Sequence, residues 1–262
     1  KSFNYLKKLN GLEDSHKKYS VTYLYSLINS GNFKGAFYYS KKLEKQKLDN
    51  FESNIIIGIF HLKNSNTNLA QKYFLKAKKS NSGLILNNYV SNSLYNWSSL
   101  DSYNLNQATL ELEKLDQRFE NLKKIQYVFL NCYFNSLNAN KLFEELTSNK
   151  KIDFSRYNYF YASFVASSNN IDKAKDIVNF ALKSYPRNLL LNQYKLDLNQ
   201  GTNTSNFDFK NKRHVVAEIL YITSNALSAQ SIYQLSNFYL NLAKYLNEEF
   251  HSYDTLLAEN FY

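Results

Sequence analysis

The chain has 262 residues, of which 44% are apolar and 21% are charged, so wholesale disorder is excluded. It contains six glycines and one proline, too few to supply the turns of a multi-stranded β protein. We therefore expect an all-α fold, arranged as one elongated domain or two compact ones.

The formal net charge of +10 comes from the first part of the chain. Residues 1–100 hold 15 Lys and Arg against five Asp and Glu, whereas residues 101–262 are balanced. Lysines number 28 and arginines only four, and bidentate recognition of phosphates and bases favours arginine. An AT-rich genome would also place lysine on neutral surface positions. Nucleic-acid binding through residues 1–100 is therefore an alternative function and not the favoured one.

In chain order, the apolar periodicity predicts helices that come in pairs, separated by short polar turns. The turn of the first pair holds Gly31 and Asn32, and the turn of the last holds Asn169 and Asn170. The expected pairs are residues 19–29 with 33–45, 52–63 with 69–77, 84–98 with 105–115, 122–137 with 140–147, and the two halves of 155–186.

Small residues recur in the second helix of each pair, and Ala36 and Ala70 are 34 residues apart. Two antiparallel helices approach closely only where a side chain is small. Each hairpin then leaves an apolar face that the next hairpin buries. The residues expected to pack at these crossings are Ala36, Gly58, Ala70, Phe74, Ala77, Ala174, Ala181 and Pro186.

The last third of the chain follows a similar plan. A single helix is expected near residues 188–198, followed by an exposed polar loop over residues 199–212. Helices at about 213–229, 231–246 and 250–261 are expected to continue the same array. Residues 2–9 resemble a second helix without its first, and residues 250–261 a first helix without its second. We therefore expect a fragment of a longer array whose first helix pair is truncated.

This layout resembles the tetratricopeptide repeat, a helical hairpin of about 34 residues. Ile57-Gly58 and His61 stand where the family has Leu-Gly and Tyr, and Ala70 and Phe74 follow at the family's spacing. The resemblance covers roughly residues 2–186, although the family's early Trp is replaced by Asn54 and Asn158. A matching register between residues 155 and 186 is kept by Tyr161, Ala162, Val165, Ala174, Val178, Ala181 and Pro186.

The resemblance implies a right-handed α-solenoid of stacked antiparallel helix hairpins, with about 14–15 helices. Its repeats would occupy residues 1–198, and residues 213–262 would continue the solenoid beyond the loop. The last part is similar to the C-terminal portion of long bacterial tetratricopeptide proteins that have no assigned activity. This implies a soluble protein of the bacterial cytoplasm or periplasm.

The residues provide no constellation for catalysis, a cofactor or a metal. The four histidines are isolated from one another, and none has a second His or Cys at ligand spacing. The glycines form no phosphate-binding loop, and no GxSxG, HExxH or CxxC motif occurs. Cys132 lies in an apolar run and is expected to be a buried small hydrophobe. No stretch is long and apolar enough for a membrane span.

The remaining functional surface is the concave groove that first helices line in the tetratricopeptide family. An apolar and aromatic groove suits a peptide or helix of another protein, so we expect a non-enzymatic scaffold for protein binding. An architectural or self-associating solenoid is a further alternative. By register, the groove residues are Val21, Tyr25, Ile28, Ile55, Ile59, Leu62, Arg156, Tyr159, Ser163 and Ser167.

Overall fold

The computed structural model describes residue 8 and residues 17–80, 83–148, 152–201 and 206–261. These residues form fourteen α-helices and no strand, which confirms the all-α expectation. The helix expected over residues 2–9 lies outside the described residues, apart from Lys8. The chain divides into two compact units, each described by itself: unit 1 takes Lys1–Phe119 with Lys212–Tyr262, and unit 2 takes Glu120–Asn211.

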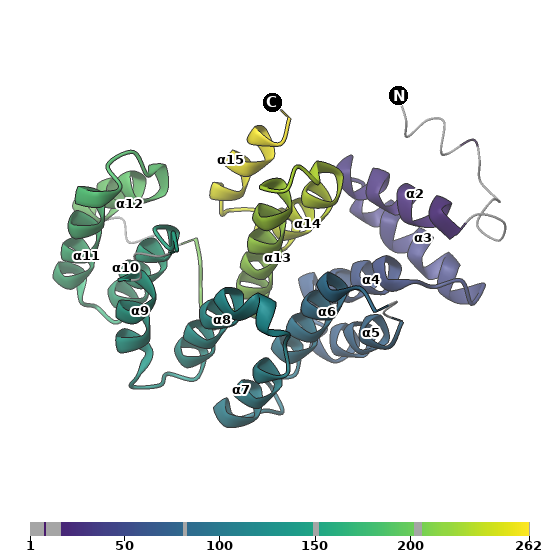
Figure 1. The fold of residues 1–262 in the computed structure, drawn as a ribbon, viewed down its shortest axis with the longest axis horizontal. Coiled ribbons are helices and arrows are strands. Elements are labelled where there is room, and N and C mark those ends of the chain that lie inside the picture. The colour runs from purple at the N-terminus through teal and green to yellow at the C-terminus, as the bar shows by residue number, and fades with distance from the viewer. Residues whose placement is uncertain (1–7, 9–16, 81–82, 149–151, 202–205, 262) are drawn as a thin grey trace. The chain divides into compact units, whose positions relative to one another are not determined.

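Most helices of unit 1 form hairpins, in which each helix packs on the next one in the sequence (Figure 1). The C-terminal hairpin α13–α14 also packs on earlier helices: α14 on α2 and α4, and α13 on α6. The bounds of its helices are α2 (Lys17–Asn29), α3 (Phe33–Lys45), α4 (Phe51–Lys63), α5 (Thr67–Lys79), α6 (Ile85–Ser98), α7 (Leu105–Glu113), the short 3₁₀ helix η1 (Gln117–Phe119), α13 (Lys212–Ser228), α14 (Tyr233–Leu246) and α15 (Ser252–Glu259).

Unit 2 is a run of five helices in which each packs on its sequence neighbour. The last helix, α12, also packs on α10. α12 ends at Gly201, whose φ of 71° is the left-handed conformation that terminates a helix. The helices are α8 (Glu120–Tyr133), α9 (Ala139–Thr147), α10 (Arg156–Ser167), α11 (Ile171–Ser184) and α12 (Leu189–Gln200).

The hairpin turns share one geometry, which explains why the helices end where they do. After α2, Gly31 adopts a φ of 75°, and the N–H of Asn32 donates to the carbonyl of Leu27 at 2.9 Å. This is a Schellman motif, which satisfies the last carbonyls of a helix. A left-handed residue recurs after α4, α8, α10 and α13, and each time the N–H of the following residue donates to the carbonyl five positions before it. The five residues are Gly31, Ser65, Asn135, Asn169 and Ser231.

Asparagine begins many of the helices. The side chain of Asn32 accepts a hydrogen bond from the N–H of Gly35 at 2.9 Å, and so caps the first turn of α3. Asparagines 50, 66, 104, 170 and 188 cap α4, α5, α7, α11 and α12 in the same way. Although the chain has few glycines, most of its turns therefore have a residue that ends the preceding helix and an asparagine that caps the next one.

Of the small residues expected at the crossings, Gly58 lies at a close contact between two helices. A Cβ placed on Gly58 of α4 would come within 2.4 Å of the Phe74 ring of α5. Phe74 has no exposed surface, and neither do Ala36, Ala70, Ala77 and Ala174. Ala181 is also buried, whereas Pro186 is exposed in the turn before α12. The helices therefore pack sequentially as in an α-solenoid, and the Gly58–Phe74 contact is one place where a small residue lets two helices approach closely.

Candidate functional site

In unit 1, the face formed by the first helices α2, α4 and α6 is covered by the hairpin α13–α14. Of the residues expected to line a groove there, Ile28, Ile55, Ile59 and Leu62 are at most 2% exposed, and Val21 is half-buried. Residues 213–262 were expected to continue the array beyond residue 198. In the structure, α13 and α14 instead pack on α2, α4 and α6, the helices that were expected to bind a partner.

Tyr25 shows how closely the covering hairpin fits. Its ring packs on the ring of Phe238 in α14, with the centroids 4.7 Å apart. Its hydroxyl donates to Oε1 of Glu52 at 3.2 Å. Burial is the main cause that raises the pKa of both Glu52 and Tyr25 above their usual values. The polar ends of these side chains are thus largely removed from solvent beside α14.

Polar contacts fix the edges of the same interface. Nζ of Lys63 lies 2.9 Å from Oε1 of Glu248, and Nδ2 of Asn29 donates to the carbonyl of Gln234 at 3.4 Å. The ring of Phe33 stacks on Tyr245 with the centroids 4.3 Å apart. α13–α14 is therefore held to the first helices by aromatic packing flanked by hydrogen bonds and an ion pair.

In unit 2, a short non-helical segment covers the first helices instead. We call residues 206–211 the strap. Its Phe207 and Phe209 are 3% and 6% exposed. Phe207 packs on Phe160 of α10 at 4.7 Å, and Phe209 on Phe129 of α8 at 5.2 Å, both measured between ring centroids. Such tilted and edge-to-face pairs add stabilisation to the burial of apolar area.

The remainder of the strap turns the chain back to α13. The carboxylate of Asp208 accepts the N–H of Lys210 at 2.8 Å, which forms a local turn. The ammonium of Lys210 donates to the carbonyl of Tyr133 at the end of α8. The strap is thus attached by two aromatic rings and a lysine.

Beside the strap lies an open cavity of about 590 Å³. This volume is within the range of roughly 300–1,000 Å³ that small-ligand pockets occupy. Its apolar surfaces are the rings of Phe164 and the strap phenylalanines, and the rest of its lining is polar. The cavity is lined by Asn135, Ser136, Ser163, Phe164, Ser167, Ser168, Phe207, Asp208, Phe209 and Lys210.

The cavity brings together two of the residues expected in the groove, Ser163 and Ser167. The two others on α10 lie elsewhere. Tyr159 is buried against Tyr194 of α12, with the ring centroids 4.9 Å apart. The guanidinium of Arg156 lies over the ring of Phe160 at 5.5 Å. Tyr159 and Arg156 therefore pack within unit 2.

The strap is the feature that sequence reasoning missed. The whole segment 199–212 was expected to be an exposed polar loop, but the structure buries Phe207 and Phe209; residues 202–205 lie outside the described part. The sequence did contain an indication that this segment is buried. Phe207 and Phe209 are separated by a single residue, so in an extended chain both rings lie on the same side.

The polar groups around the cavity are an amide, serine hydroxyls, the carboxylate of Asp208 and the ammonium of Lys210. Residues 120–211 contain no histidine, so the serine hydroxyls have no imidazole base beside them in this unit. The hydroxyl of Ser167 instead donates to the carbonyl of Phe164 at 2.7 Å. Burial raises the pKa of the Cys132 thiol well above its usual value, which keeps it protonated. Within the described ranges, no three His, Cys, Asp or Glu side chains gather as a metal would require.

Taken together, the folds of the two units define an all-helical protein of the α-solenoid, helical-repeat class. None of the helices in the described residues is both long and apolar enough to cross a bilayer. Comparison with models of known protein families gives no match, and comparison with curated proteins finds no similar sequence.

Proposed function

We propose that this is a non-enzymatic repeat protein of the tetratricopeptide type that binds a peptide segment of another protein in unit 2. The site is the cavity between the strap and α10. One observation carries the proposal: the first-helix face of unit 2 already holds a non-helical aromatic segment, and an open cavity continues beside it. The chain thus provides its own example of the kind of ligand that this face accepts.

The lining of the cavity offers an apolar surface for a peptide side chain and hydrogen-bonding groups for a peptide backbone. Phe164 is half-buried and offers an apolar surface for a side chain. The amide of Asn135 can donate to and accept from a peptide backbone, and the hydroxyls of Ser167 and Ser168, which donate to the carbonyl of Phe164, can accept from it. A ligand held in this way is recognised by one apolar side chain and by backbone hydrogen bonds.

The test is a selection of displayed random peptides on the intact protein, followed by calorimetric titration of the selected peptides. Ser167 is exposed and lines the cavity, so Ser167→Arg fills the cavity without burying the new charge. We expect this variant to lose the selected peptides. Ser184 is exposed at the end of α11 and does not line the cavity, so Ser184→Arg is the matched control and keeps them.

Two results would contradict the proposal. The first is a selection that yields no peptide with saturable binding. The second is equal affinity of both arginine variants for the selected peptides, because binding would then occur away from the cavity. Circular dichroism of both variants shows that the loss is not caused by unfolding.

A further inference from the structure

The positive charge of the chain is concentrated on two neighbouring helices of unit 1. Helices α3 and α5 have 13 residues each and together hold eight lysines and one acid, Glu44. Residues 101–262, by contrast, have equal numbers of basic and acidic residues. These two helices supply seven of the ten excess positive charges, and a general preference for lysine codons would not concentrate the excess in this way. The lysines are Lys34, Lys41, Lys42, Lys45, Lys72, Lys76, Lys78 and Lys79.

Side-chain contacts of Glu44 join α3 to α5. The carboxylate of Glu44 binds the ammonium groups of Lys41 and Lys76, and it accepts the hydroxyl of Tyr73 at 2.9 Å. Asp49, which follows α3, accepts Nδ2 of Asn54 at 3.1 Å. Lys41 and Lys76 are thus paired with Glu44, whereas Lys34, Lys45, Lys72 and Lys79 of the same helices are exposed.

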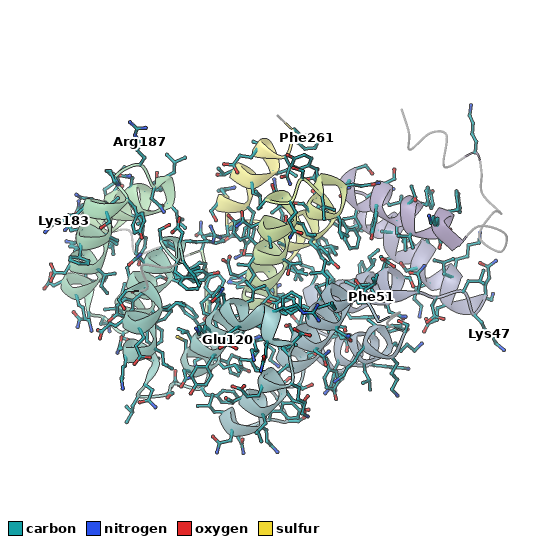
Figure 2. The ribbon with its side chains drawn as sticks, viewed as in Figure 1. Lys47, Phe51, Glu120, Lys183, Arg187 and Phe261 are labelled. Carbon is teal, nitrogen blue, oxygen red and sulfur yellow. The ribbon has the colours of Figure 1, made fainter. Side chains whose placement is uncertain are left out.

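The exposed lysines form a stripe along each helix. On α3, Lys34, Lys42 and Lys45 are spaced by eight and three residues, which places them on one face. On α5, Lys72 and Lys79 are seven residues apart and share a face in the same way. All five are exposed. Lys47, just beyond α3, is exposed as well and extends the charge past the end of the helix (Figure 2).

An exposed aromatic ring lies within the stripe on α3. Tyr38 is 69% exposed and follows Lys34 by one helical turn. Its position between lysines places a flat apolar surface among positive charges. Nucleic acid that is not read by sequence is bound by this combination, because bases stack on aromatic rings while cations contact the phosphates. An anionic membrane would attract the same charges and also accepts tyrosine at its interface, so the experiment below includes lipid vesicles as a comparison.

We propose that the face of α3 and α5 binds single-stranded nucleic acid without preference for base sequence. The exposed lysines contact phosphates, and one base stacks on Tyr38. From Lys34 to Lys45 the helix rises by about 16 Å, which is long enough to contact several successive phosphates of one strand. Lysine carries a point charge and lacks the bidentate geometry of arginine. It therefore suits contact with the phosphate backbone of the nucleic acid better than contact with base edges.

The experiment titrates the protein with a fluorescent RNA of mixed sequence, about 20 nucleotides long, at several salt concentrations. The variant Lys34→Gln/Lys45→Gln/Lys72→Gln removes three exposed charges and keeps the helix propensity. We expect it to bind more weakly and to lower the slope of log affinity against log salt by about 2. The control removes three lysines from unit 2, at positions 124, 183 and 195, for the same change in net charge, and it keeps the slope.

Tyr38 separates stacking from charge. Tyr38→Ala leaves the charge unchanged, and we expect it to weaken binding about 5-fold or more. Tyr38→Phe retains the ring and the affinity. The same proteins are also mixed with vesicles that contain phosphatidylserine. The proposal is overturned if the RNA does not bind at low salt, if both lysine variants lose affinity equally, or if the lysine variant loses the vesicles while it keeps the RNA.

Discussion

The contact between Gly58 and Phe74 allows a sharp test of the repeat packing. Gly→Ala inside a helix normally stabilises a protein by about 1 kcal/mol, because alanine has the higher helix propensity. At Gly58 we expect the opposite sign. The new Cβ would lie 2.4 Å, 2.6 Å and 3.0 Å from three carbons of the Phe74 ring, whereas ordinary contacts begin near 3.4 Å.

The magnitude follows from how little the ring can move. To relieve the clash, Phe74 must shift by about 1 Å in a site where it has no exposed surface. Overpacking of this kind costs about 1–3 kcal/mol. Three simultaneous overlaps with a fully buried ring place Gly58→Ala in the upper part of that range. After the gain in helix propensity, we expect a net loss of about 1–2 kcal/mol.

Urea unfolding of four proteins measures this effect: wild type, Gly58→Ala, Phe74→Leu, and the double variant. Leucine at position 74 removes the ring atoms that the new Cβ would meet. The double variant should therefore be more stable than the sum of the two single effects predicts, by at least about 1 kcal/mol. A stabilising Gly58→Ala, or additive effects in the double variant, would refute the packing argument.

Three further changes test other parts of the structure. Ala70→Leu places a large side chain at a buried crossing and should cost about 1–3 kcal/mol by urea unfolding, whereas Ala226→Leu on an exposed part of α13 should cost little. Partial burial tends to raise the pKa of Glu44, but hydrogen bonds from two lysines and Tyr73 lower it to about 2. Its stabilisation is therefore complete above pH 4.5 and is lost as the pH falls towards 2; Glu44→Gln should remove about 1 kcal/mol at neutral pH and flatten the stability curve in that window. Phe209→Ala should cost about 3–5 kcal/mol and increase hydrogen exchange in α8 and α10; unchanged exchange would show that the strap does not support these helices.

Local features of the fold could be predicted from the sequence because they depend on neighbouring residues. The turn at Gly31 and Asn32 is an example: one residue adopts the left-handed conformation, and the next caps the following helix. The helix over residues 33–45 was predicted with the bounds that α3 has. The small residues at crossings were also accessible, because close helix approach imposes a size limit at fixed spacing.

The covering of the first helices could not be predicted in the same way. An apolar face must be buried, but its pattern does not say whether a partner or another part of the chain buries it. For α4, a signal was available: Ile55, Ile56 and Ile57 are consecutive, so they point to three sides of the helix, and all are buried. A helix that is apolar on several sides indicates full enclosure. This argues against an open groove at α4.

The candidate site was predictable only in part. Ser163 and Ser167 were placed on the first-helix face from the repeat register, and both line the cavity. The other wall of the cavity comes from Phe207 and Phe209, which belong to no helix and follow no repeat. Their attachment depends on rings of α8 and α10 that are distant in sequence.

The division of the chain has a consequence for its synthesis. The chain leaves unit 1 after residue 119 and returns to it at residue 212. Contacts such as the one between Asn29 and Asn241 therefore close a loop of 212 residues. At about 5–20 residues per second, translation of residues 120–211 takes roughly 5–20 s. Throughout that interval the apolar side of α2, α4 and α6 has no cover on the ribosome, so we expect this surface to recruit chaperones during translation.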